Sequence, residues 1–332
     1  MPLYRSMILL FMILTTSPVG FGQDYSTSIV GTDFDLITDN DDSCFVTLAY
    51  ERFDKLAEMP DKTRDGLFRP AYVFRANYSD ETQVKVFVDA RFGSQEAASA
   101  EAMRYVGRLG KLPTALRGGV KRLVIHKSKE ETTAFSDRGL IVMYSANATK
   151  RINDKDLEET LFHESVHASW DSKHAKSEGW KRAQLADGTF ATMYAKRKPD
   201  LEDLAESALF AFAVIHHPAR LPADDLKRIK RSIPNRIMYV ETLIPAGQPL
   251  TYKVEPADFC DVDLSRTGIA KDIIANVLTK HYQLTDTEVA DCLEYLGEEL
   301  ILVTARKLKI DEKEFRKKVE DMKHVNCDHA KQ

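Results

Sequence analysis

Two histidines four positions apart, His163 and His167, are the residues whose types and spacing point most directly to chemistry. They belong to the sequence His-Glu-Ser-Val-His. On an α-helix, side chains at positions i and i+4 lie on one face about one turn apart, so both imidazoles can bind one tetrahedral zinc ion. Glu164 lies one residue further round the helix, where it can reach a metal-bound water without binding the metal. The pattern therefore predicts two zinc ligands and a general base.

The flanking sequence favours a helix over residues 157–173. Asn153 and Asp154 are suitable N-cap residues, and acidic residues follow in the expected first turn, where they complement the helix dipole. Apolar residues recur at helical spacing at Leu157, Leu161, Phe162, Val166 and Trp170. The alternative is an amphipathic helix that carries two histidines by chance. The coincidence of the motif with a helical context favours the metal site.

A catalytic zinc needs a third protein ligand and one open position for water. His174 follows the motif, but it comes one residue too late for the spacing of a third histidine ligand, and no glycine breaks the helix before it. The other candidates are Glu202 and Glu206, one turn apart on a largely apolar helix expected over residues 200–212. Because unpaired carboxylates are costly on a buried helix, we expect one to bind zinc and the other to hydrogen-bond a ligand histidine.

The order of the expected elements indicates the fold class. Strands are expected at 72–76, 83–88, 120–126 and 139–145, and a helix at 94–109. The first two strands should form a hairpin or lie side by side. This order predicts an α+β fold in which a mainly antiparallel or mixed sheet backs the motif helix. The strand at 139–145 directly precedes that helix. It is expected to be the edge strand beside the cleft, where a peptide can pair with it by β-addition.

The remaining stretches are assigned from composition. Residues 24–66 predict an extended arm or a subdomain of short elements, with one helix over 46–57, and residues 127–138 predict a polar loop. The chain is expected to be irregular over 171–198 and helical over 222–243. Further helices are expected at 269–281, 285–308 and 312–323.

These assignments divide the chain into four parts. Residues 1–22 predict a signal peptide, and residues 23–68 an N-terminal arm. Residues 69–245 predict the catalytic domain, and residues 246–332 a C-terminal helical region.

The start of the chain predicts export from the cytoplasm. Arg5 precedes a short apolar run, residues 7–14, and small residues lead to an expected cleavage before Gln23. No later stretch is long and apolar enough to span a bilayer. We therefore expect a soluble protein without stable membrane insertion, secreted, or periplasmic in a bacterium.

Charge and cysteine content agree with an exported globular protein. The net charge of −4 gives no case for a nucleic-acid partner. The four cysteines form an even set, which suggests disulfides outside the cytoplasm. Three pairings are possible and the sequence does not choose among them, although we favour Cys260 with Cys327 and Cys44 with Cys292. The sequence also leaves the oligomeric state open.

The motif and the acidic helix together resemble a known family. The sequence HESVH followed by PDLEDLAESALFAF is similar to the gluzincin-type zinc metallopeptidases, and closest in style to the catalytic core of anthrax lethal factor. The resemblance covers roughly residues 115–215 and implies a zincin-like catalytic domain. It implies His163, His167 and Glu202 as zinc ligands and Glu164 as the base. Glu206 matches the second acidic position, which implies a partner for a ligand.

The resemblance also implies a catalytic tyrosine shortly before the third ligand. Tyr194 is the match, with a spacing one residue longer than the usual pattern. We expect its hydroxyl to donate to the oxyanion of the tetrahedral intermediate. His216 and His217, at the end of the acidic helix, are alternative donors.

These residues predict a secreted zinc-dependent endopeptidase that cleaves peptides or proteins with a zinc-activated water. One alternative is a zinc hydrolase that acts on a non-peptide amide. Another is a non-catalytic secreted protein that keeps a zincin-like shell for binding. The intact Glu164 counts against the second alternative, because zinc binding alone does not need it.

Overall fold

The structure is a computed structural model, and it describes residues 34–252 without a gap. It also describes Ser28, Thr32 and Lys309, together with residues 311–315, 317 and 318. The predicted signal peptide and the helices expected at 269–281 and 285–308 lie outside these residues. Residues 312–315, 317 and 318 are helical, as expected for this part of 312–323.

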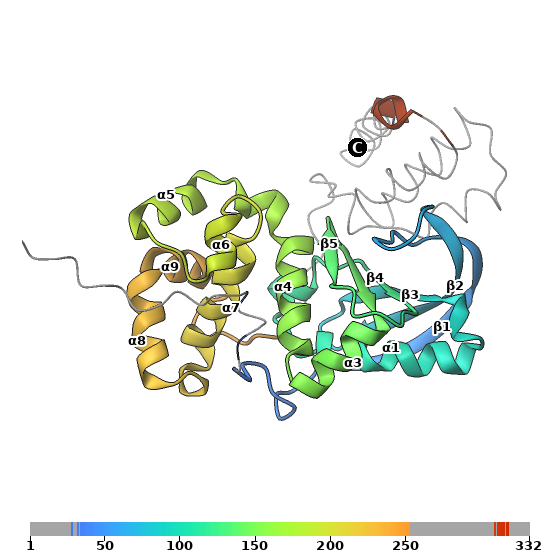
Figure 1. Ribbon diagram of the computed structural model, residues 1–332, viewed down its shortest axis with the longest axis horizontal. Helices are drawn as coiled ribbons and strands as arrows, with labels where there is room; N and C mark the ends of the chain where they lie inside the picture. The colour runs from blue at the N-terminus through green and yellow to red at the C-terminus, as the bar shows by residue number, and fades with distance from the viewer. Residues whose placement is uncertain are drawn as a thin grey trace, which may run out of the picture.

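Among the described residues, six strands form one mixed sheet in the order β1-β2-β3-β4-β6-β5 (Figure 1). Strands β1, β2 and β3 form an antiparallel meander, while β3, β4 and β6 are parallel. Strand β5 runs antiparallel to β6 at the edge of the sheet. The strands are β1 (Phe45–Glu58), β2 (Phe68–Tyr78), β3 (Gln83–Asp89), β4 (Arg122–His126), β5 (Phe135–Asp137) and β6 (Leu140–Tyr144). The mixed sheet with its helices agrees with the predicted α+β class.

Two expectations about this sheet are wrong. The stretch 46–57 is not a helix but most of β1, which pairs with β2 and carries three irregularities in its register. Its apolar residues recur at helical spacing, yet several of them are exposed on the outer strand, including Val46 and Leu56. The second error concerns the edge beside the motif helix. Strand β6 lies between β4 and β5, and the edge strand is β5, within the stretch expected to be a loop.

The helices on the sheet side largely follow the sequence. Helix α1 (Gln95–Leu109) begins at Ser94, whose side chain accepts a hydrogen bond from the Ala97 amide, and connects β3 to β4. Asn153 and Asp154 do not cap the motif helix, because they end α3, which was not expected, and Lys155 then adopts a left-handed conformation. The short helices α2 (Thr114–Arg117) and α3 (Ser145–Asp154) precede the motif helix α4 (Leu157–Ser169), whose N-cap is Asp156.

A second group of helices follows α4. The expected acidic helix is α7 (Asp203–His216), with Glu202 as its N-cap residue. The helix expected over 222–243 is divided into two at Ile233, because Pro234 begins a new helix there. Residues 171–198 are not irregular, since they contain a π-helical turn and two α-helices. These elements are Asp171–Ala175, α5 (Glu178–Asp187) and α6 (Met193–Arg197). The two helices on either side of Ile233 are α8 (Ala223–Ser232) and α9 (Pro234–Leu243).

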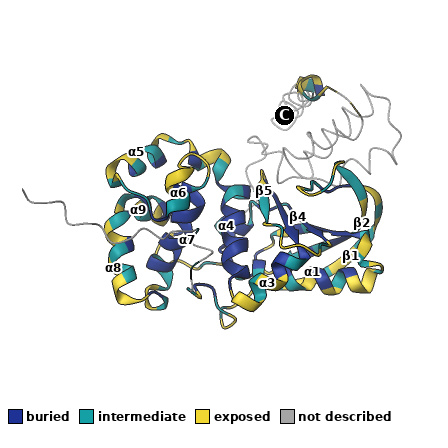
Figure 2. Ribbon diagram, in the orientation of Figure 1, coloured by how far each residue is buried: buried dark blue, intermediate teal, exposed yellow. Residues whose placement is uncertain are grey.

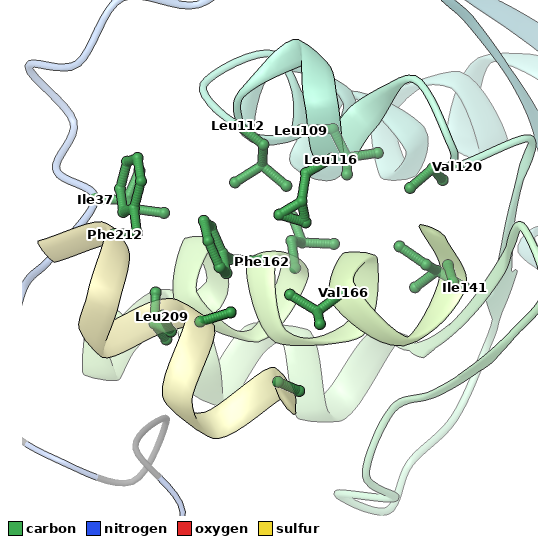
Figure 3. Packing of buried hydrophobic residues seen from close by; sticks show 14 of the residues in the cluster. Ile37, Leu109, Leu112, Leu116, Val120, Ile141, Phe162, Val166, Leu209 and Phe212 are labelled. Carbon is green, nitrogen blue, oxygen red and sulfur yellow. The ribbon is translucent and has the colours of Figure 1, made fainter. Parts of the chain in front are cut away.

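Helix α4 lies between the sheet and the second group of helices, and both α4 and α7 are buried over most of their surface (Figures 1 and 2). Phe162 of α4 packs against Phe212 of α7, with ring centroids 5.1 Å apart. Val166 of α4 and Leu209 of α7 belong to the same core, which extends to Leu116 of α2 (Figure 3). The motif helix is therefore fixed by apolar packing on both sides.

No helix among the described residues is long and apolar enough to cross a membrane. Cys44 carries a free thiol in this structure, and burial raises its pKa. Its predicted partner Cys292 lies outside the described residues, as do Cys260 and Cys327. The disulfides therefore stay a prediction.

The first turn of α4 ties down the N-terminal segment. The Glu159 carboxylate accepts hydrogen bonds from the Leu36 amide at 2.7 Å and the Ile37 amide at 2.8 Å. Its other oxygen, Oε2, is buried and has no hydrogen-bond partner in the part of the chain that the structure describes. Burial raises the pKa of Glu159 to about 7, against the lowering effect of the two amides.

We expect this carboxylate to make stability depend on pH. Because its folded-state pKa lies above its ordinary value, its contribution to stability falls as pH rises from about 4.5 to 7. Glu159→Gln keeps an acceptor oxygen but carries no charge. As pH rises from 5 to 8, the free energy of unfolding of the variant should therefore increase relative to that of the wild type, by at most about 3 kcal/mol.

The measurement is urea unfolding of both proteins at the two pH values. Glu178→Gln is the matched control, because the Glu178 side chain is 93% exposed. A difference between Glu159→Gln and wild type that is the same at both pH values would contradict the prediction.

Candidate metal centre

Helices α4 and α7 bring His163, His167 and Glu202 together. The His167 Nε2 atom lies 3.2 Å from His163 Nε2 and 3.2 Å from Glu202 Oε2. The third side of this triangle, from His163 Nε2 to Glu202 Oε2, is 3.4 Å. Both histidines come from successive turns of α4, and Glu202 comes from the N-cap of α7. This is the one group of metal-capable side chains found among the described residues.

The size of the triangle can be compared with a metal site. Zinc binds nitrogen and oxygen ligands at about 2.0–2.2 Å with tetrahedral geometry, so two ligand atoms of one ion lie roughly 3.3 Å apart. The three measured separations are 3.2, 3.2 and 3.4 Å. Two imidazoles and one carboxylate are also a donor set that zinc accepts. The three side chains therefore fit three corners of a zinc tetrahedron, with the fourth corner available for water.

Acidic side chains lie behind both histidines. His167 Nδ1 is 2.7 Å from Asp171 Oδ2, on the turn that follows α4. His163 Nδ1 is 3.3 Å from Glu206 Oε1, close enough for charge attraction although the atom makes no hydrogen bond with any described residue. Metal-binding histidines usually direct their second nitrogen to a carboxylate, which fixes the tautomer. The arrangement of Asp171 and Glu206 matches this pattern.

Glu202 and Glu206 are held in place by hydroxyl groups. The Tyr194 hydroxyl donates to Glu202 Oε1 at 2.8 Å, while Glu202 Oε2 faces the histidines. Glu206 is completely buried, and its Oε2 atom accepts a hydrogen bond from Thr192 Oγ1 at 2.8 Å. Each glutamate thus has one oxygen directed toward a histidine and the other fixed by its neighbours.

The electrostatics of the cluster reflect this crowding of acids and imidazoles. Burial lowers the pKa of His163, but Glu202 and Glu206 outweigh it and raise that pKa to about 10. Burial likewise lowers the pKa of His167, and hydrogen bonds with Asp171 and Glu202 raise it to about 9. Burial raises the pKa of Glu202, but the two histidines hold it far below its usual range. The cluster therefore favours positive charge at the position between its three ligand atoms.

Glu164 is buried beside the cluster, on the side that faces the sheet. The Ser136 hydroxyl of β5 donates to Glu164 Oε2 at 2.6 Å. Lys62 approaches the same region from the loop after β1. Burial lowers the pKa of Lys62, while the negative charges of Glu164 and Glu202 oppose that effect. Glu164 is thus fixed by the edge strand and does not belong to the ligand triangle.

The other histidines proposed from the sequence lie elsewhere. His174 Nδ1 is 2.8 Å from the Tyr239 hydroxyl, so it is directed to α9. His216 and His217 lie at the far end of α7 from Glu202, about 20 Å along the helix axis. His216 Nε2 contacts the Ile244 carbonyl oxygen at 3.1 Å. Neither His216 nor His217 is brought to the cluster, so the structure gives no support to them as oxyanion donors.

Sequence reasoning missed three residues that hold the cluster in place, Asp171, Thr192 and Ser136. Asp171 was accessible to pattern analysis, because it lies four positions after His167 and so on the same helical face. Thr192 and Ser136 act across the fold, and no local spacing points to them. Tyr194 was expected to be a free donor, but its hydroxyl is bonded to Glu202.

Comparison with known proteins finds no match for this chain, whether to a protein family, a curated protein or a solved structure.

We expect Asp171→Ala to weaken zinc binding 10- to 100-fold, because His167 loses the acceptor that fixes its tautomer and ring orientation. Competition with a fluorescent chelator measures the affinity. Asp224→Ala is the control, since Asp224 lies on α8 and its side chain is fully exposed. Equal zinc affinities for the two variants would show that Asp171 does not support the site.

Proposed function

We propose that this chain is an exported zinc-dependent peptidase with a zincin-like catalytic domain similar to the core of anthrax lethal factor. The observation that carries the proposal is the triangle of His163 Nε2, His167 Nε2 and Glu202 Oε2, with sides of 3.2 to 3.4 Å. Its size and donor set suit one zinc ion. A buried carboxylate, Glu164, lies beside it.

Zinc bound at this triangle would lower the pKa of its water and polarise the scissile carbonyl. Glu164 then accepts the proton of the attacking water and passes it to the leaving amine nitrogen. The hydrogen bond from Ser136 holds one oxygen of Glu164 at 2.6 Å and leaves the other for this transfer. The carboxylate is therefore positioned before substrate arrives.

Tyr194 has two candidate roles in this mechanism. In the structure its hydroxyl donates to Glu202 at 2.8 Å, and so it orients the third ligand. To donate to the oxyanion, the hydroxyl must leave Glu202 during the reaction. Lys198 Nζ lies 3.3 Å from the same hydroxyl and 3.9 Å from Glu202 Oε1. Its positive charge can therefore partly replace the hydrogen bond that Glu202 loses when the hydroxyl leaves.

Strand β5 offers a place for an extended substrate. It is the edge strand of the sheet within the described residues, and its Ser136 contacts Glu164. An extended peptide can add to such an edge through main-chain hydrogen bonds. This replaces the strand at 139–145, which lies inside the sheet. A peptide paired with β5 would pass the proposed base.

Two glutamate variants separate the base from the ligand. Glu164→Gln should lower the rate of peptide hydrolysis about 10²–10⁴-fold, because glutamine cannot accept the proton. Its zinc content should stay at one per chain. Glu202→Gln should lose both activity and zinc, because it replaces a ligand carboxylate with a neutral amide. The measurements are hydrolysis of a peptide library and elemental analysis of each protein, with and without chelator.

Three outcomes would change the assignment. Full zinc occupancy in His163→Ala would refute the proposed site. Wild-type cleavage by zinc-loaded Glu164→Gln would refute the mechanism. A wild-type protein that binds zinc but cleaves no peptide would instead favour a zinc hydrolase of a non-peptide amide or a binding protein.

A further inference from the structure

A second site lies at the end of the parallel strands. Strands β3, β4 and β6 end side by side at Asp89, His126 and Tyr144. A cavity of about 280 Å³ opens there, between these strand ends and the loop after β1. The carboxyl ends of parallel strands are a common position for ligand sites, because side chains and loops converge there. None of the residues proposed for zinc lines this cavity.

The wall of the cavity is strongly basic. Four of its side chains carry positive charge, and Glu130 is its one carboxylate among the described residues. The positive side chains are Arg64, Arg91, Lys127 and Lys129.

The buried carboxylates of Asp61 and Asp89 hold the arginines in place through hydrogen bonds. Asp89 accepts hydrogen bonds from Arg91 Nε at 2.8 Å and from Arg64 Nη2 at 3.2 Å. Asp61 accepts from Arg64 Nε at 2.8 Å and from Arg69 Nη1 at 3.0 Å. Three guanidinium groups thus surround two carboxylates, which leaves an excess of positive charge. Burial raises the pKa of Asp89, but His126, whose Nδ1 atom lies 3.7 Å from Asp89 Oδ2, and the hydrogen bonds from Arg91 outweigh it, so the carboxylate stays ionised.

The arginines keep donors free for a ligand. Arg64 and Arg91 bond through Nε and Nη2, and their Nη1 groups have no hydrogen-bond partner among the described residues. Their side chains are 35% and 46% exposed. Lys127 and Lys129 are exposed at the rim. Fixed guanidinium groups with free N–H donors suit the oxygen atoms of a carboxylate or phosphate.

A short segment links this cavity to the zinc site. Thr132 lines the cavity, and Ser136, four positions later, donates to Glu164. Four residues span at most about 14 Å even when fully extended. Lys62 also connects the cavity with the segment before β5. Its amide donates to the hydroxyl of Tyr144, which lines the cavity, at 2.7 Å, and its ammonium group donates to the Ala134 carbonyl at 3.0 Å. A peptide bound along β5 can therefore reach both places.

We propose that this basic cavity binds an acidic side chain of the peptide substrate, a carboxylate or a phosphate, within about four residues of the cleaved bond. The inference rests on the proposed peptidase function and names the substrate class. On this proposal the cavity determines which substrates are cleaved.

The test measures binding separately from cleavage. Zinc-loaded, full-length Glu164→Gln is titrated with fluorescent decapeptide pools that carry glutamate, phosphoserine, glutamine or lysine at one fixed position. The glutamate and phosphoserine pools should bind at least tenfold more tightly than the glutamine pool. Inorganic phosphate at millimolar concentration should remove this preference. Comparison of the glutamate and phosphoserine pools identifies which anion the pocket prefers.

Charge reversal at the rim locates the effect. Lys129→Glu, introduced into the Glu164→Gln protein, should reduce the preference for acidic peptides about tenfold. The reason is that the substitution changes the charge close to the ligand by two units. Lys227→Glu is the matched control. Lys227 lies on α8, its side chain is 68% exposed, and the substitution changes the net charge equally. This control should keep the full preference.

Two results with the peptide pools would overturn the inference, and a third would come from the phosphate titration. One is equal binding of the glutamate and glutamine pools. The other is an equal effect of Lys129→Glu and Lys227→Glu, which would indicate attraction by overall charge. Phosphate binding without a preference among peptides would also refute the substrate assignment, since the pocket would then take a free anion. Failure of the peptidase proposal is distinguishable, because it appears as absence of cleavage by the wild type.

Discussion

The packing of α4 against α7 is the contact on which the candidate metal centre depends. The two histidines proposed as ligands lie on α4, and Glu202, the proposed third ligand, is 35 positions further along the chain than His167. The two helices meet through buried apolar side chains, and the contact between the tilted rings of Phe162 and Phe212 fixes their relative position. Helix α7 is buried from Asp203 to Val214, as expected for a helix that is apolar on nearly all sides. A shift of α7 would move Glu202 away from the histidines.

The second group of helices fixes the start of α7 by electrostatic contacts. Arg236 of α9 is fully buried and donates to Asp203, the residue next to Glu202, at 2.9 Å. The same guanidinium reaches Asp187, at the end of α5, at 3.1 Å. A buried guanidinium needs carboxylate partners to offset its loss of water, and Nε and Nη1 of Arg236 have them, so the three residues constrain one another. Helices α5 and α9 therefore position Glu202 without contacting the proposed zinc.

Local periodicity explains what the sequence could predict. The histidine pair, α1, α4 and most of α7 depend on spacing within one helix, and the strands near 72–76, 83–88, 120–126 and 139–145 depend on runs of β-forming residues. The error at β1 has the same origin. Val46 and Leu56 fall at helical spacing, but pairing with β2 decides the conformation. Pairing order is also non-local, which is why β6 was taken for the edge instead of β5. Ser136 and Thr192 reach the site only through tertiary structure.

The remaining exposure of the cluster indicates the direction of access. Glu206 is completely buried, whereas the side chains of His167 and Glu202 are 14% and 15% exposed. The groups beside this opening include Lys198, next to Glu202, and Lys62, whose ammonium group feels the charges of Glu164 and Glu202. Two lysines at an opening over several carboxylates lower the repulsion that an acidic substrate would otherwise meet. The basic cavity near β5 adds further positive charge at a distance from the cluster. The same charges that balance the buried acids thus also favour the approach of an anionic chain.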